Sequence, residues 1–258
     1  MSETNGGDRG VSEALSFVLV FALVIGSIAI VYTVGLGGLQ DARDHERINN
    51  AERAFEVFGE NLDDIVLDGA PSRSTQIRMS DATLSVQEAA YVEITGTNPE
   101  TGENYTYPPQ QVRSLAFESG DSTVSYTGGA VVRSDGDGDG VMVREPPFLF
   151  EDDRMVLPIV RLSSGGSVAV SGDQVIQVRT EQVLRRNDPV NGTEFDSVEV
   201  NVSTDNPGAW NRYMEDSGME CEEPDPGAGE DGLALVSCEH EDVEQLRVVV
   251  IRIDVAFE

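Results

Sequence analysis

Three aspartates at alternate positions are the residues with the clearest potential for chemistry, in the run Asp135-Gly136-Asp137-Gly138-Asp139-Gly140. A Ca²⁺-binding loop begins in this way, because oxygens at positions 1, 3 and 5 converge on one ion and glycine allows the sharp turn. Position 12 of such a loop supplies a bidentate Glu, whereas this chain has Pro146 there. The run is therefore predicted to be either a Ca²⁺ site formed by Asp135, Asp137 and Asp139 or an acidic turn between two strands, and the missing ligand favours the turn.

Motifs typical of enzymes are not found in the sequence. It contains no G-x-S-x-G elbow, no GKS or GKT phosphate loop and no H-E-x-x-H. Its two histidines are His45 and His240, and the acids beside His240 cannot converge with it, because adjacent side chains alternate between the faces of a strand. We therefore expect a protein that is not an enzyme and has no cofactor, with a hydrolase built on paired acids as the enzymatic alternative.

The two cysteines, Cys221 and Cys238, flank an acidic loop rich in Pro and Gly. They are either a disulfide that closes this loop or two unrelated buried thiols. The apolar run at residues 14–34, described below as a predicted membrane anchor, implies export and so favours the disulfide. Three N-glycosylation sequons begin at Asn104, Asn191 and Asn201. Each sequon alone is a weak signal, but together they favour an external domain.

The charge of the chain is strongly one-sided. The formal net charge is −30, from 47 acidic and 17 basic residues, and all the basic residues are arginine. This composition is typical of proteins adapted to molar salt, where the Debye length is only about 3 Å and long-range fields vanish. Nucleic-acid binding requires clustered basic residues that face phosphates, and no such cluster occurs. We therefore expect no nucleic-acid partner.

An uncharged apolar run occupies residues 14–34. At a rise of about 1.5 Å per residue, such a helix would span about 31 Å, which is the thickness of a bilayer's hydrocarbon core. A secretory h-region is usually shorter, so the run is predicted to be a permanent single-pass anchor in the cell membrane. The basic residues on its two sides do not decide its orientation, whereas the sequons and cysteines favour an extracellular C-terminal domain.

Helical spacing resumes beyond the apolar run, after Gly35, Gly37 and Gly38, which are expected to loosen the helix. Six apolar residues then recur at intervals of three or four: Ile48, Ala51, Phe55, Phe58, Leu62 and Ile65. This stripe predicts an amphipathic helix that packs on the following domain, with a coiled-coil or filament seam as the alternative. The sequence Asp68-Gly69-Ala70-Pro71 is expected to end the helix, because Gly suits a C-cap and Pro cannot continue it.

Short segments with β-strand character follow, separated by turn residues. They cover residues 76–79, 83–86, 91–95, 111–118, 122–126, 130–133, 141–144, 155–162, 167–170, 174–184, 196–202 and 246–257. A short helix is predicted over residues 206–217, with Trp210 and Tyr213 as packing residues or, as the alternative, a binding platform.

The predicted fold class is therefore α+β, with a long N-terminal helix and an antiparallel β-sandwich-like head domain. The domain organisation follows from these elements in chain order. We expect a leader or cytoplasmic tail over residues 1–10, a transmembrane helix over 11–36, an amphipathic helix over 37–68 and a β-rich extracellular domain over 69–258.

The stretch Asp8-Arg9-Gly10-Val11-Ser12-Glu13, which runs directly into the apolar segment, resembles the signal of archaeal type IV pilins and archaellins. The resemblance implies cleavage by a prepilin-type peptidase between Gly10 and Val11. It also implies that Glu13 contacts the amino terminus of a neighbouring subunit in a homo- or hetero-polymer of pilin-like proteins.

Two further stretches, residues 48–55 and 69–75, resemble a group of uncharacterised haloarchaeal membrane-anchored proteins with pilin-like N-termini. We therefore expect a non-enzymatic cell-surface protein of pilin-like architecture, such as a minor pilin or a surface-filament subunit. The alternative is a monomeric surface binding module, either Ca²⁺-dependent or glycan-binding, on a single-span anchor.

Overall fold

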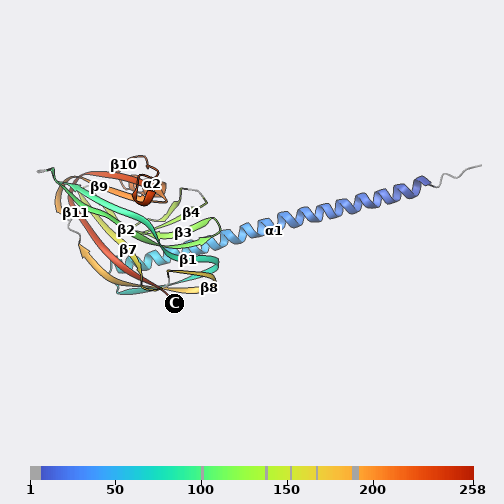
Figure 1. Cartoon of the computed structure of the whole chain (residues 1–258), viewed down its shortest axis with the longest axis horizontal. Helices are drawn as coiled ribbons and strands as arrows, with labels where there is room; N and C mark the ends of the chain where they lie inside the picture. The colour runs from blue at the N-terminus through green and yellow to red at the C-terminus, as the bar shows by residue number, and fades with distance from the viewer. Residues whose placement is uncertain (1–6, 100–101, 137–138, 152, 167, 188–191) are drawn as a thin grey trace, which may run out of the picture. The chain divides into compact units, whose positions relative to one another are not determined.

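The computed structural model (Figure 1) describes residues 7–99, 102–136, 139–151, 153–166, 168–187 and 192–258, with side chains described from residue 14 onward except 33–42, 44, 192 and 193. The chain divides into two compact units, Met1–Glu46 and Arg47–Glu258, and each is described by itself. It is an α+β protein, as predicted, with an apolar N-terminal helix and a strand-rich C-terminal domain.

The N-terminal unit consists of the first part of helix α1, which is assigned over Gly7–Val66 and continues through Gly35, Gly37 and Gly38. Every residue of its stretch Ala14–Tyr32 is exposed, and the mean hydropathy there is 2.8. By length and composition this stretch can cross a membrane, and a signal sequence near an N-terminus has the same properties.

The last part of α1 belongs to the second unit. The predicted stripe from Ile48 to Ile65 is buried in the domain, and each of its six side chains is at most 3% exposed. The stripe therefore packs on the sheet of its own chain, which leaves none of it for a coiled-coil seam. The helix ends where predicted: Gly69 has φ +73°, and the N–H of Ala70 donates to the carbonyl of Asp64.

The described strands all belong to one sheet of eleven strands. The main path runs β5-β4-β3-β2-β1-β8-β11-β7-β6; β9 pairs with both β1 and β11, and β10 pairs with β11. The strands are β1 (Ser72–Thr97), β2 (Asn104–Ser119), β3 (Ser122–Thr127), β4 (Ala130–Asp135), β5 (Val141–Arg144), β6 (Leu149–Glu151), β7 (Arg154–Ser164), β8 (Ala169–Asn187), β9 (Gly192–Thr204), β10 (Glu220–Cys221) and β11 (Ala234–Phe257). A sandwich of two separate sheets is not confirmed.

Two features of the sheet differ from the sequence expectation. Three predicted short segments, 76–79, 83–86 and 91–95, are parts of the single strand β1, which pairs with β8 along its first half and with β9 along its second. The expectation of a purely antiparallel sheet was wrong, because β7 and β11 pair in parallel. The long connection between these strands permits this pairing, since parallel neighbours need a crossover rather than a hairpin.

The strand-rich domain has two hydrophobic cores. In the first, the buried stripe of α1 packs against residues such as Leu115, Tyr126 and Ile251, and we call this the α1 core. The second lies around helix α2 (Pro207–Asp216) and is called the α2 core. Trp210 and Tyr213 are buried in the α2 core, which confirms their prediction as packing residues.

Candidate binding site

The two faces of strand β3 differ in chemistry, and this difference builds a polar pocket. Val124 and Tyr126 point into the α1 core and are fully buried. Thr123, Ser125 and Thr127 lie at the alternate positions and line a pocket on the opposite face. Successive side chains of a strand point to opposite faces, so the apolar packing of one face leaves the hydroxyl groups on the other.

The strand register aligns polar residues of neighbouring strands in rows across the pocket floor. Gln87 of β1 lies opposite Ser114 of β2, which lies opposite Thr127 of β3. A second row contains Glu118, Thr123 and Ser134. Directly opposed side chains of neighbouring strands are close enough to act together on one ligand.

The tight turn between β3 and β4 positions the floor. It consists of Gly128 and Gly129, with φ of +62° and +109°. Positive φ at both central residues suits the two-residue turns that match the twist of a hairpin, and glycine adopts it without strain. A Cβ at Gly129 would also lie 2.8 Å from the Cδ of Pro147. Glycine at this position therefore serves both the turn and the close packing.

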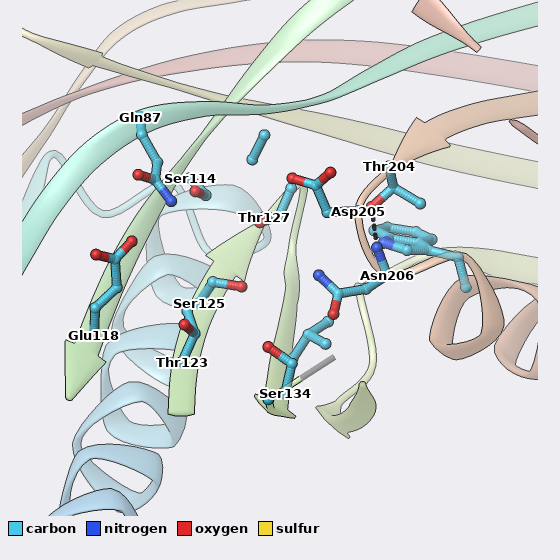
Figure 2. A pocket seen from close by; sticks show the side chains of 14 residues that line it. Gln87, Ser114, Glu118, Thr123, Ser125, Thr127, Ser134, Thr204, Asp205 and Asn206 are labelled. Carbon is cyan, nitrogen blue, oxygen red and sulfur yellow. Dashed lines mark hydrogen bonds between the residues drawn. The ribbon is translucent and has the colours of Figure 1, made fainter. Parts of the chain in front are cut away.

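One wall of the pocket comes from the end of β9 and the segment that joins β9 to α2. Thr204, Asp205 and Asn206 line it, and the backbone N–H of Asn206 donates to Thr204 Oγ1 at 3.2 Å. Figure 2 shows Asp205 and Asn206 beside the Ser and Thr side chains of the strands, and the hydrogen bond from Asn206 to Thr204. Trp210 also lines the pocket, although it is only 2% exposed and its ring packs near Phe148 in the α2 core.

The pocket has a volume of about 400 Å³, and its described lining residues carry carboxylates but no arginine. The carboxylates are those of Glu118 and Asp205. The hydroxyl of Ser114 is 1% exposed, lines the pocket and has no hydrogen-bond partner in the described chain. A buried hydroxyl without a partner is costly, so a ligand group that bonds to it would be favoured. The pocket is thus equipped to form hydrogen bonds with a polar ligand that carries no negative charge.

The predicted aspartate cluster lies at the edge of this region. Asp135 pairs with Arg133 at 3.1 Å, and Arg133 also pairs with Glu52 of α1. Asp139 Oδ1 accepts from the N–H of Gly208 at 3.1 Å, which caps the start of α2. Asp137 lies outside the described residues. In the described part of the chain, no three His, Cys, Asp or Glu residues form a group suited to a metal, and Ca²⁺ binding stays a prediction.

The cysteines and sequons occupy different parts of the domain. Cys221 and Cys238 form a disulfide between paired positions of β10 and β11. Asn104 is exposed at the start of β2, whereas Asn201 is half-buried and donates to Glu199 at 2.9 Å. Asn191 lies outside the described residues.

The predicted processing residues occupy the beginning of α1. Gly10 and Val11 lie in its first turns, and Glu13 follows them. The side chains of these three residues are outside the described part, so their roles stay predictions.

Charged groups are also partly buried at two places away from the pocket. Asp63 of α1 pairs with Arg144 of β5, and both side chains are half-buried. Burial raises the pKa of Asp63, although the hydrogen bond from Arg144 opposes the shift. Burial, followed by the charges of Glu199 and Glu230, raises the pKa of Glu93 on β1. Neither arrangement contributes to the pocket.

An apolar N-terminal helix joined to a single-sheet, strand-rich domain defines the class of this α+β protein. The chain belongs to the DUF7289 family, a family of unknown function, whose model matches residues 9–256. The match therefore spans both the apolar helix and the strand-rich domain. A comparison with curated proteins finds no match.

Proposed function

We propose that this protein is a non-enzymatic cell-surface protein, anchored by one membrane-spanning helix, with its strand-rich domain outside the cell. One contrast within α1 carries the proposal. Every residue of Ala14–Tyr32 is exposed and the stretch is uncharged, whereas the stripe from Ile48 to Ile65 is buried in the domain. Exposed apolar surface of this extent needs a lipid or protein environment.

The extracellular orientation rests on the chemistry of the domain. A disulfide between Cys221 and Cys238 persists in oxidising surroundings and is rare in the cytosol. The exposed sequon at Asn104 is accessible to a glycosylation enzyme, which agrees with the same orientation.

A pilin-like architecture is the more specific form of the proposal. It is supported by the resemblance of residues 8–13 to archaeal type IV pilin signals. In this form, a prepilin-type peptidase cuts between Gly10 and Val11, and the apolar helices pack together in a membrane-bound or filamentous polymer. The processed amino terminus then pairs with Glu13 of a neighbouring subunit.

N-terminal sequencing of the chain purified from its own membrane tests this proposal. We expect the mature chain to begin at Val11, and we expect Gly10→Val to abolish cleavage while the matched variant Gly7→Val is still cut. Protease added to intact cells should remove the domain. A mature chain that begins at Met1 or Ser2 would contradict the pilin-like form, and a domain protected in intact cells would contradict the surface location.

A second candidate function is a surface binding module, and the polar pocket favours it. Calcium titration of the full chain in detergent distinguishes the two versions of this module. The ion pairs of Asp135 and the helix-capping role of Asp139 favour the version that does not depend on calcium. We expect Ca²⁺ to leave the melting temperature unchanged relative to an equal ionic strength of NaCl, and a saturable increase would favour the calcium-dependent version.

A further inference from the structure

We infer that the pocket between the β1–β4 surface and the Thr204–Asn206 segment binds a neutral carbohydrate, recognised through its hydroxyl groups. This inference deepens the second candidate function and does not depend on the anchor or its orientation. It rests on the type, register and burial of the lining side chains.

The pocket floor offers a dense set of groups that both donate and accept hydrogen bonds. Ser114, Ser125 and Thr127 present hydroxyls on neighbouring strands, and Gln87 adds an amide in the same row. A hydroxyl donates one hydrogen bond and accepts others, so such a surface matches the alternating hydroxyls of a sugar ring. The strands fix these side chains on a rigid scaffold, which reduces the entropic cost of binding.

Burial distinguishes this floor from an ordinary polar surface. Ser114 and Thr127 are 1% and 6% exposed, and the hydroxyl of Ser114 has no partner in the described chain. Water-excluded hydroxyls discriminate strongly between ligands that satisfy them and ligands that do not. The floor therefore favours a ligand that delivers hydroxyl groups to it over an apolar ligand of the same size.

The charge of the pocket selects against anions. Glu118 and Asp205 line it, and none of its described lining residues is an arginine. The carboxylates accept hydrogen bonds from sugar hydroxyls, and such charge-assisted bonds are stronger than neutral ones. They repel phosphate and carboxylate groups, so a neutral sugar is preferred to a sugar acid.

The size and shape of the pocket agree with this ligand class. Its volume of about 400 Å³ falls within the common range of about 300–1,000 Å³ for ligand pockets, although its lining is far more polar than usual. Trp210, which is 2% exposed, lines the pocket at the end near α2 and offers an apolar contact there.

Trp210 also provides the measurement, because it is the only tryptophan in the chain. The full chain is purified in a detergent that has no sugar headgroup and is titrated with glucose, galactose, mannose and N-acetylglucosamine, followed by tryptophan fluorescence and calorimetry. The titrations are made at about 1 M salt, where long-range charge effects are screened. We expect saturable binding of at least one neutral sugar with a change in fluorescence, and binding of glucuronate at least about tenfold weaker.

Three variants connect the binding to the pocket. Thr127→Val and Ser125→Ala each remove one hydroxyl, and we expect each to weaken sugar binding about three- to tenfold. Thr95→Val removes a hydroxyl from β1 outside the pocket and should leave the affinity unchanged. Melting temperatures are recorded for all three, and Ser125→Ala, whose side chain is only half-buried, remains informative if Thr127→Val fails to fold.

Three results would overturn the inference: no saturable binding of any neutral sugar, glucuronate bound as strongly as the neutral sugars, or equal affinities in the pocket variants and in Thr95→Val. None of these results changes the N-terminal sequence or the cellular location. A failed sugar titration is therefore distinguishable from a failure of the anchored-protein proposal.

Discussion

Phe58 of α1 packs edge-on against Tyr126 of β3, with ring centroids 5.3 Å apart and ring planes at 88°. Both side chains are fully buried, and aromatic pairs favour this arrangement because a positive ring edge meets a negative ring face. The contact makes the end of α1 part of the domain's core. It also places α1 and the pocket on opposite faces of β3.

The first prediction concerns this contact. Phe58→Ala should destabilise the domain by about 3–5 kcal/mol, because it removes a large buried side chain and leaves a cavity between helix and sheet. Chemical denaturation followed by circular dichroism measures the change. Val57→Ala, on the exposed side of the same helical turn, should cost less than about 1 kcal/mol. Equal effects of the two substitutions would mean that the helix is not docked as described.

The second prediction concerns where a folded fragment can begin. A fragment that starts at Ala70 lacks the entire stripe of α1 and should not fold cooperatively, because the sheet would expose the apolar face of the α1 core. A fragment that starts at Arg43 retains the stripe and should show a cooperative thermal transition. A sharp transition in the shorter fragment would show that α1 is dispensable for folding.

The third prediction concerns the ion pair between Asp63 and Arg144. Gly59 lies beside it, and a Cβ there would lie 2.7 Å from Arg144 Cδ, so that a larger residue would displace the Arg144 side chain. Arg144→Met should destabilise the domain by about 2–4 kcal/mol at neutral pH, since it leaves the Asp63 carboxylate in a mostly buried site without its partner.

A double-mutant cycle checks that the loss comes from the pair. Adding Asp63→Asn to Arg144→Met should recover part of the stability, with a coupling energy above about 1 kcal/mol. Simple addition of the two single effects would show that the charges act independently of each other.

The fourth prediction concerns pH. The pKa of Glu93 is raised above its ordinary value of 4.5, so the folded state binds this proton more tightly than the unfolded chain does. Ionisation of Glu93 therefore costs stability as the pH rises through its folded pKa, and the cost disappears below the ordinary pKa.

The variant Glu93→Gln removes this cost. It should stabilise the domain at pH 7 by less than about 1 kcal/mol, because solvent screens a group that is only partly buried. The gain should vanish near pH 4, and Glu88→Gln on the same strand serves as the exposed control. If Glu93→Gln stabilised the domain equally at both pH values, the raised pKa of Glu93 could not be the cause.

The fifth prediction concerns the disulfide. Replacement of Cys221 and Cys238 by alanine should lower the free energy of unfolding by about 3 kcal/mol, because the crosslink restricts the unfolded chain over 17 residues. Reduction of the unaltered protein should give a similar loss, and should give none in the alanine variant. A stability unaffected by reduction would mean that the bond contributes nothing to the fold.

Several elements were predictable from the sequence because their signals are local. The stripe from Ile48 to Ile65, the end of α1 near Gly69 and the helix that carries Trp210 depend on spacing and capping within a few residues. The number of residues in each strand was not predictable. In β1, for example, the pairing partner changes along the strand, and only long-range contacts keep the chain extended.

The pocket was invisible in the sequence for a related reason. The alternation in Ser122-Thr123-Val124-Ser125-Tyr126-Thr127 predicted a strand, but an alternating pattern does not tell whether its polar face meets water or lines a cavity. That outcome depended on where the segment from Thr204 to Asn206 lies, which is far away in the chain.

By itself, the sequence determined an uncharged apolar stretch near the start, an amphipathic continuation and a strand-rich remainder, because hydropathy and periodicity act over neighbouring residues. Only the tertiary structure decided that the stripe of α1 is a core element, that β7 and β11 run in parallel and that hydroxyls from several strands meet in one pocket. These features arise from contacts between residues distant in the chain, and such contacts are selected by the packing of the whole domain.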